Sequence, residues 1–115
     1  MLHVGNPGPG GTQNLAQKPS SAGAIARKAI TVGAPGNHPT NNERRCLTTV
    51  AIEWSGAEID QGQQITHISV WDALTSGDPK YIHALATPKT TDAGGVVIDA
   101  GDLEFAFTVF AKPAE

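Results

Sequence analysis

His67, Ser69 and Asp72 are the residues whose types and spacing come closest to a catalytic arrangement. A histidine, a serine and an aspartate can form a hydrolytic triad, in which the histidine takes the proton of the serine hydroxyl. The histidine must then lie within hydrogen-bond reach of that hydroxyl. On a strand, however, His67 and Ser69 would begin about 7 Å apart. We therefore predict that the three residues belong to a strand and the turn after it, and that the chain has no catalytic residue.

Histidines and cysteines, the usual ligands of transition metals, are few and scattered. His3, His38, His67 and His83 show no H-x-x-x-H or H-E-x-x-H spacing, which would direct two imidazoles at one metal ion. Cys46 is the only cysteine, so one chain can form neither a disulfide nor a zinc site built from several cysteines. We predict no metal site and no cofactor, and we interpret Cys46 as a small buried side chain on a strand.

Aspartates are concentrated in predicted turns. Each lies close to glycine, proline or threonine: Asp60, Asp72, Asp78, Asp92, Asp99 and Asp102. An aspartate in a turn accepts a hydrogen bond from the nearby backbone, and none of these has the D-x-D-x-D-G pattern of a calcium loop. The glycines of residues 8–11 are likewise not followed by the Gly-Lys-Ser/Thr of a phosphate-binding loop. We predict turn-forming roles, and we expect Asp72 to accept a backbone N–H in the turn after Trp71.

Trp54, Trp71 and Tyr81 are the side chains best suited to stack on a sugar or to anchor a partner protein. Large aromatic side chains are, however, highly buried on average. We therefore favour core packing, with Trp71 covering one end of the fold beside a hairpin-like connection. A carbohydrate-binding surface stays open as the alternative.

The elements that must position these residues are short strands. Alternating or β-branched apolar residues predict strands at 46–54, 64–71, 81–86, 95–99 and 103–110. The second of these has apolar residues on both sides, so we expect it to lie in the middle of a sheet. In the last one, every second residue from Leu103 to Val109 is apolar, which predicts one buried face. Residues 24–32 combine helix-forming and strand-forming residues, and we predict a strand for their second half.

Glycine, proline and polar residues divide the chain. Residues 5–23 are rich in them, and three prolines there exclude a regular helix or a central strand. Because this composition buries little apolar surface, we expect residues 5–23 to become ordered only against another chain. The predicted organisation is an N-terminal strand and arm over 1–23, a β-sandwich domain over 24–111 and a C-terminal tail over 112–115.

The fold that these elements predict is all-β. Short strands separated by frequent turn signals, without a convincing helix, are typical of a compact antiparallel β-sandwich of jelly-roll or immunoglobulin-like type. Charged residues make up only 17% of the chain and the net charge is −3, which disfavours nucleic-acid binding. No stretch approaches the roughly 20 apolar residues that span a bilayer, and the first residues lack the pattern of an export signal. We expect neither membrane association nor export.

Several short segments carry a resemblance to a known family through their order along the chain. They are LHVGNPG (2–8), ARKAITVGAP (26–35), NN (41–42), AIEW (51–54), ITHISVWDA (65–73), SG (76–77), ALATPKT (84–90) and IDAGDL (98–103). Each is only a packing or turn signature, but in this order they resemble a family of small virion proteins of tailed phages that infect actinobacteria. The resemblance covers nearly the whole chain.

This resemblance implies a non-enzymatic structural protein of the tailed-phage virion, assembled in the host cytoplasm. The first expectation is a capsid decoration or cement protein, and the alternative is a minor tail or fibre-associated protein. The implied partners are the major capsid protein or tail proteins, together with further copies of the same chain. The family offers no catalytic residue that could be carried over. A carbohydrate-binding adhesin module is the alternative from a different class.

Overall fold

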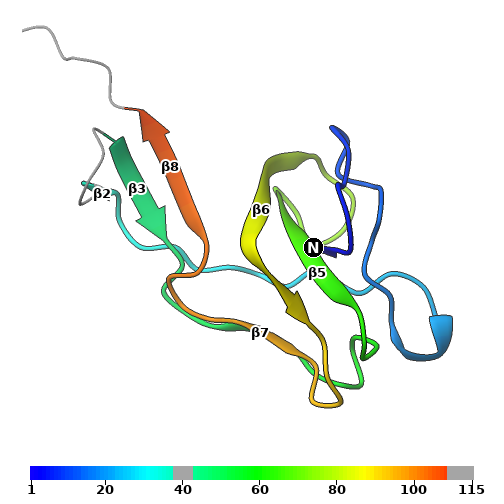
Figure 1. Cartoon of the computed structure of the whole chain (residues 1–115). Coiled ribbons are helices and arrows are strands. Elements are labelled where there is room, and N and C mark those ends of the chain that lie inside the picture. Colours follow the sequence, from blue (N-terminus) through cyan, green and yellow to red (C-terminus); the bar gives the residue numbers. More distant parts are fainter. Residues whose placement is uncertain (38–42, 109–115) are drawn as a thin grey trace, which may run out of the picture. The chain divides into compact units, whose positions relative to one another are not determined.

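The chain folds from short β-strands joined by long loops (Figure 1). The computed structural model describes residues 1–37 and 43–108. The strands are β1 (Leu2–His3), β2 (Gly36–Asn37), β3 (Glu43–Leu47), β4 (Ile52–Trp54), β5 (Gln64–Trp71), β6 (Pro79–Thr90), β7 (Val96–Ile98) and β8 (Glu104–Thr108). Within the described ranges the only helix is a 3-10 turn, η1 (Pro19–Ser21). The all-β prediction is confirmed, while the sandwich type stays a prediction.

Contacts along the backbone divide the chain into two units. Residues 1–29 and 53–97 form the first unit, and residues 30–52 and 98–115 form the second. The division falls within the short strands β4 and β7. The boundaries drawn from the sequence, at residues 23 and 111, stay a prediction, because contacts do not show whether the body folds without the arm.

In the first unit, β5 is the middle strand of a three-stranded sheet in the order β1-β5-β6. Both pairings are antiparallel, and Ile68 lies opposite Leu2 on one side and His83 on the other. Ile65, Ile68 and Ser69 are all buried, so both faces of β5 are covered. The predicted bounds and the central position of this strand are confirmed, because β-branched residues occupy both of its sides.

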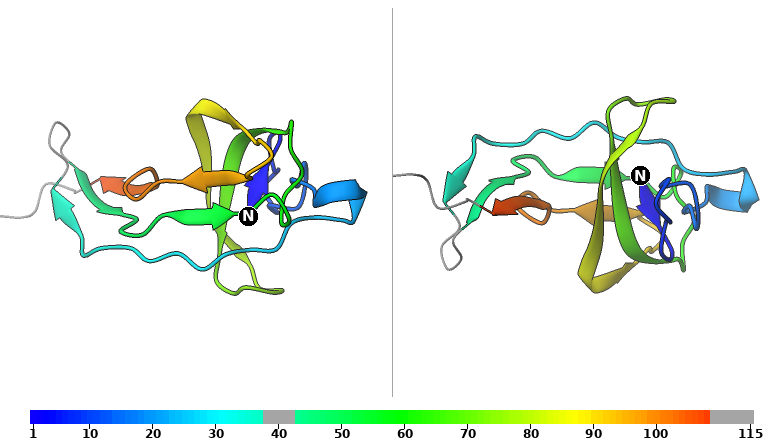
Figure 2. Two further views of the ribbon diagram at one scale, coloured as in Figure 1. Left: turned by 90° about the horizontal axis from the view of Figure 1, so that it is seen from below. Right: turned by 90° about the horizontal axis from the view of Figure 1, so that it is seen from above.

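Strands β4 and β7 pair with each other, and their arrows point in opposite directions in Figure 2. The chain after β4 passes very close to the turn before β7. A Cβ atom on Gly95 would lie 1.8 Å from the backbone oxygen of Trp54, and one on Gly56 would lie 2.0 Å from that of Ala93. Gly95 also has a φ of +96°, which side-chain-bearing residues rarely adopt. This crossing therefore requires glycine.

In the second unit, three antiparallel strands follow the order β2-β3-β8. The predicted strand 46–54 is wrong as one element: β3 ends at Leu47, and Val50 lies in a bend with 56% of its surface exposed. The pairing with β8 continues only to Thr48, whose N–H donates to the oxygen of Leu103, because the next N–H, that of Thr49, donates to the oxygen of Thr31 instead. Cys46 is half-buried on β3 rather than buried.

The predicted buried face of the last strand is only partly described. Leu103, just before β8, is 1% exposed, whereas Phe105 on β8 is half-buried. The side chain of Phe107 and the whole of Val109 lie outside the described residues. Cys46 lies opposite Phe105 in the ladder between β3 and β8.

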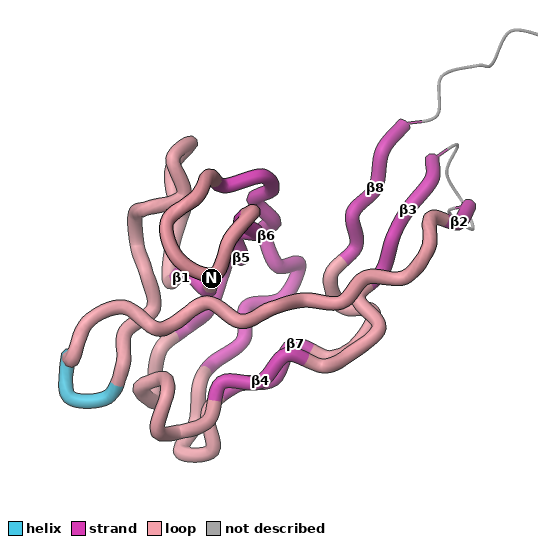
Figure 3. The backbone as a smooth tube through the Cα atoms, turned by 180° about the vertical axis from the view of Figure 1, so that it is seen from behind, coloured by secondary structure: helices cyan, strands magenta, loops and turns pink. Residues whose placement is uncertain are grey.

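The arm lies against its own chain, and Figure 3 shows that loops make up most of it. The side chain of Gln63 accepts a hydrogen bond from the N–H of Gln17 and donates one to its oxygen, at 2.8 and 3.0 Å. Ala16 is fully buried. The expectation that residues 5–23 become ordered only against another chain is therefore wrong, because a side-chain amide of the body replaces a partner strand. Residues 24–32 form no strand, and Val32 makes only an isolated bridge.

Candidate functional site

A histidine and a serine do meet in the first unit, but the histidine is His3. Its Nε2 lies 2.6 Å from Oγ of Ser69, and its Nδ1 lies 2.8 Å from the oxygen of Gln13. The indole Nε1 of Trp71 donates to the same Ser69 oxygen at 2.8 Å. His3 comes from β1 and Ser69 from the centre of β5, which is why strand pairing brings them together.

The directions of these hydrogen bonds follow from the groups that can only accept or donate. The carbonyl of Gln13 only accepts, so Nδ1 of His3 carries the hydrogen. Nε2 of the neutral ring is then the acceptor, and the Ser69 hydroxyl donates to it while accepting from Trp71. Burial lowers the pKa of His3 below its ordinary value, although the bond to Gln13 opposes this shift. The structure therefore favours the neutral ring.

This pair has the reach of a general base and its nucleophile, but it is closed to substrates. His3 is fully buried and Ser69 is 1% exposed. A nucleophilic oxygen must approach a substrate atom closely, and the Ser69 oxygen is enclosed and already accepts the Trp71 N–H. The arrangement instead ties β1, β5 and the arm residue Gln13 together.

His67 and Asp72, which lie near Ser69 in the sequence, form hydrogen bonds with other residues. Nδ1 of His67 bonds Oγ1 of Thr66 at 2.8 Å. The carboxylate of Asp72 accepts the backbone N–H of Asp78 at 2.9 Å, which confirms its predicted role in the turn. Sequence spacing gave no sign of His3 as the partner of Ser69, since the two lie 66 positions apart.

The other turn aspartates behave as predicted where the structure shows their bonds. Asp92 accepts the N–H of Gly94, Asp60 that of Gln61 and Asp102 that of Asp99. Trp54 is 3% exposed and donates to the oxygen of Ala26. Tyr81 is half-buried and stacks on His83. Core packing is thus confirmed for Trp54.

The 72–78 loop, which joins β5 to β6, is exposed at every residue. Arg27 stacks on the Trp71 ring at 3.8 Å from the ring centre, and its Nη1 donates to the oxygens of Ala73 and Ser76. Asp72 and Asp78 close the base of the loop through two hydrogen bonds. Although exposed, the loop has a fixed shape.

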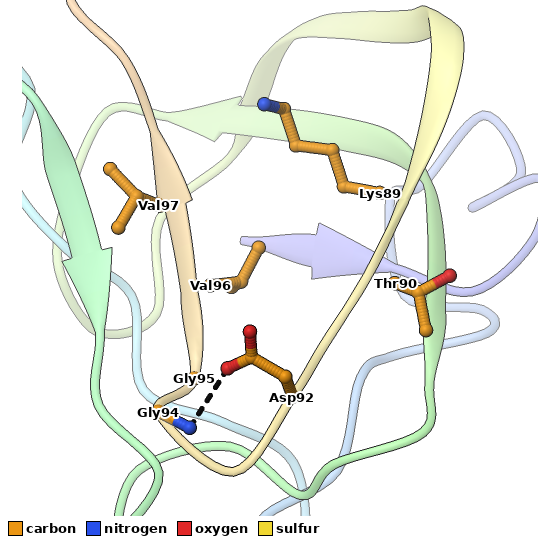
Figure 4. A pocket seen from close by; sticks show the side chains of 7 residues that line it. All are labelled: Lys89, Thr90, Asp92, Gly94, Gly95, Val96 and Val97. Carbon is orange, nitrogen blue, oxygen red and sulfur yellow. Dashed lines mark hydrogen bonds between the residues drawn. The ribbon is translucent and has the colours of Figure 1, made fainter.

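A pocket of about 380 Å³, here called the Val96 pocket, lies between the end of β6 and the start of β7. Its lining residues are Lys89, Thr90, Asp92, Gly94, Gly95, Val96 and Val97 (Figure 4). In Figure 4 the Val96 side chain lies between those of Lys89 and Asp92. Val96 is buried, whereas Val97 is 40% exposed. The pocket thus has an apolar floor and a cationic group in its lining, but no aromatic ring.

The described part of the chain lacks both a metal-binding cluster and a membrane-spanning helix. Residues 1–37 and 43–108 contain no group of three or more histidine, cysteine, aspartate or glutamate side chains placed to hold a metal ion. No helix within these ranges has the length and apolar character needed to cross a membrane.

Comparison with known proteins identifies the family. Residues 1–106 match the family described as podophage GP4 fiber I protein gp80. Neither the curated proteins nor the solved structures provided a match. The matched stretch runs from β1 into β8, so the relationship covers every described element except the last two residues of β8. The chain therefore belongs to the family of the podophage GP4 fiber I protein gp80 and is a structural component of a phage virion.

Proposed function

We propose that this chain is a non-enzymatic component of a podophage fibre, which holds its place through contacts with other virion proteins. The observation that carries the proposal is the family match over residues 1–106. It favours the fibre-associated alternative over capsid decoration, which the sequence suggested first. The partners we propose are tail or fibre proteins, together with further copies of the chain.

Labelling of purified virions tests where the protein lies. An antibody against the chain, imaged by electron microscopy, should mark the fibres in wild-type particles and nothing in particles that lack the gene. Labels spread over the head would favour capsid decoration and overturn the fibre assignment. Growth on an actinobacterial host would separately test the origin that the sequence suggested.

The non-enzymatic part of the proposal is supported by the enclosure of the only histidine–serine pair found within the described residues. Intact particles should show the same activity on host surface polysaccharides whether they carry wild-type chain or Ser69→Ala. Particles of the Ser69→Ala variant that assemble normally but lose such an activity would contradict it.

A carbohydrate-binding role is the second candidate. The Val96 pocket offers Lys89, Asp92 and the backbone of two glycines as polar groups, but sugar sites usually also present an aromatic face. A glycan array probed with the purified chain, with Lys89→Met as the control, tests it: binding that this substitution abolishes would favour it.

A further inference from the structure

The 72–78 loop is exposed, but several hydrogen bonds fix its backbone conformation. All seven of its residues are exposed, yet Arg27 donates hydrogen bonds to two of its carbonyls and the Asp72–Asp78 bonds close its base. Gly77 suits this shape, because its φ is +75° and a Cβ there would lie 2.2 Å from the Asp72 carboxylate and displace it. A loop that is ordered in advance loses little conformational entropy when it binds a partner.

This fixed loop presents one large apolar side chain to solvent. Leu74 is 59% exposed, the highest value among the large apolar side chains of the described residues. A single exposed leucine is ordinary on a protein surface. Leu74 differs because the backbone that carries it is held in one shape.

The Val96 pocket complements the 72–78 loop in polarity and charge, because valine side chains and a lysine line it. Its floor is the buried Val96, its exposed edge is Val97, and Lys89 belongs to its lining. The 72–78 loop offers a carboxylate to match, because Asp78 is exposed and forms no ion pair with any described residue. The loop therefore presents an exposed leucine and an exposed carboxylate, while the pocket has the buried Val96 as its floor, the exposed Val97 at its edge and the half-buried Lys89 in its lining.

The two features lie at opposite ends of the same strand (Figure 1). The loop leads directly into Pro79, the first residue of β6, while Lys89 and Thr90 are its last residues. The two therefore cannot meet within one chain without unfolding β6. Contact between the loop of one copy and the pocket of another leaves a free loop and a free pocket at the two ends, so further copies can add.

We propose that copies of this chain join head to tail, with Leu74 of one copy seated on Val96 of the next and Asp78 beside Lys89 of that copy. This proposal goes beyond the fibre assignment, which does not specify how copies meet. The two proposals can fail separately. If the purified chain does not self-associate, the head-to-tail contact is wrong, even if virion labelling places the chain on the fibres.

Sedimentation velocity of the purified full chain over a range of concentrations tests the proposal. The wild-type protein should grow in size with concentration, while Leu74→Ser and Val97→Glu should each stay monomeric. An equimolar mixture of these two variants should form a dimer and nothing larger, because it contains one working loop and one working pocket. A wild-type chain that is monomeric throughout, or a mixture without dimers, would overturn the proposal.

Charge reversal supplies a second, independent measurement. Asp78→Lys and Lys89→Asp should each weaken association about tenfold, as expected for a close interfacial charge pair, and the two together should restore most of it. Val50→Ser and Asp99→Lys serve as matched controls, because both residues are exposed and neither lies in the loop or the pocket. Circular dichroism of every variant verifies the fold. A double variant as weak as the two single ones would contradict the Asp78–Lys89 contact.

Discussion

The sheets of the two units pair their strands in the same way but stabilise them differently. In the first unit, Ile65, Ile68 and Ser69 of β5 are buried, and the Ser69 hydroxyl bonds the rings of both His3 and Trp71. In the second unit, every described side chain of β3 and β8 is only half-buried, and Arg45 pairs with Glu104 across the ladder at 3.2 Å. An antiparallel ladder therefore does not reveal how much its side chains contribute to stability.

The largest loss of stability is expected at Gly95, which lies in the first unit next to the β4–β7 pair. The Cβ of Gly95→Ala would overlap the Trp54 oxygen, so we expect a loss on the order of 4 kcal/mol in the free energy of unfolding, measured with urea. Gly62→Ala is the control, because Gly62 also has a positive φ but nothing lies within 4 Å of its Cβ position. We expect about 1 kcal/mol there, from backbone strain alone. Equal losses would show that crowding at Gly95 does not matter.

Truncating one apolar side chain in each sheet measures how much side-chain burial contributes to the stability of that sheet. Ile65 is fully buried, so Ile65→Ala should cost about 3 kcal/mol. Phe105 is half-buried, so Phe105→Ala should cost about 1 to 2 kcal/mol despite the larger side chain. Chemical denaturation of both variants gives the answer, and a greater loss at Phe105 would reverse the comparison.

The buried hydroxyl of Ser69 should contribute more to stability than the half-buried hydroxyl of Thr66 on the same strand. Ser69→Ala leaves His3 Nε2 and Trp71 Nε1 without their partner, and we expect it to cost about 2 kcal/mol. Thr66→Ala on the same strand removes the bond to His67, but both of these residues are half-buried and water can replace it. A thermal or urea denaturation that ranks Thr66→Ala above Ser69→Ala would contradict the role of burial.

The first sheet should also respond to acid. In the unfolded chain His3 titrates near its ordinary value of about 6.5, whereas burial holds the pKa of the folded form lower. Between these two values the unfolded chain binds more protons, so the free energy of unfolding falls as the pH decreases through this range and levels off below it. Denaturation at several pH values from 8 to 4 should show a smaller fall for His3→Gln. Part of the fall should remain in His3→Gln, because burial also lowers the pKa of the Met1 amine, to about 5.

The smallest effect is local and concerns the arm. Gln63→Ala removes the acceptor of the Gln17 N–H, so we expect faster hydrogen exchange at Gln17, equivalent to about 1 kcal/mol of local stability. Gln61→Ala should leave this exchange unchanged, since Gln61 is exposed and its side chain makes no hydrogen bond to a described residue. Unchanged exchange in Gln63→Ala would mean that other contacts order the arm.

Local patterns predicted the elements that local chemistry determines. The bounds of β5 follow from its β-branched residues, and the Asp72 turn follows from a bond between residues six positions apart. The pairing of His3 with Ser69 could not be predicted, because it depends on β1 reaching β5 across 66 positions. The same holds for the break at residues 48–51, where the backbone bonds shift to Thr31 and Gly101, both distant in the sequence. The ordering of the arm was missed because a side chain supplies its strand-like partner.

The pairing of β1 with β5 has a consequence for the synthesis of the protein. Leu2 and His3 leave the ribosome well before their partners, which follow 66 positions later. At about 5 to 20 residues per second, β1 waits roughly 3 to 13 seconds before its sheet can close. Such long-range pairing also slows folding of the completed chain. β1 therefore stays unpaired, and the nascent arm unprotected, until β5 has been translated.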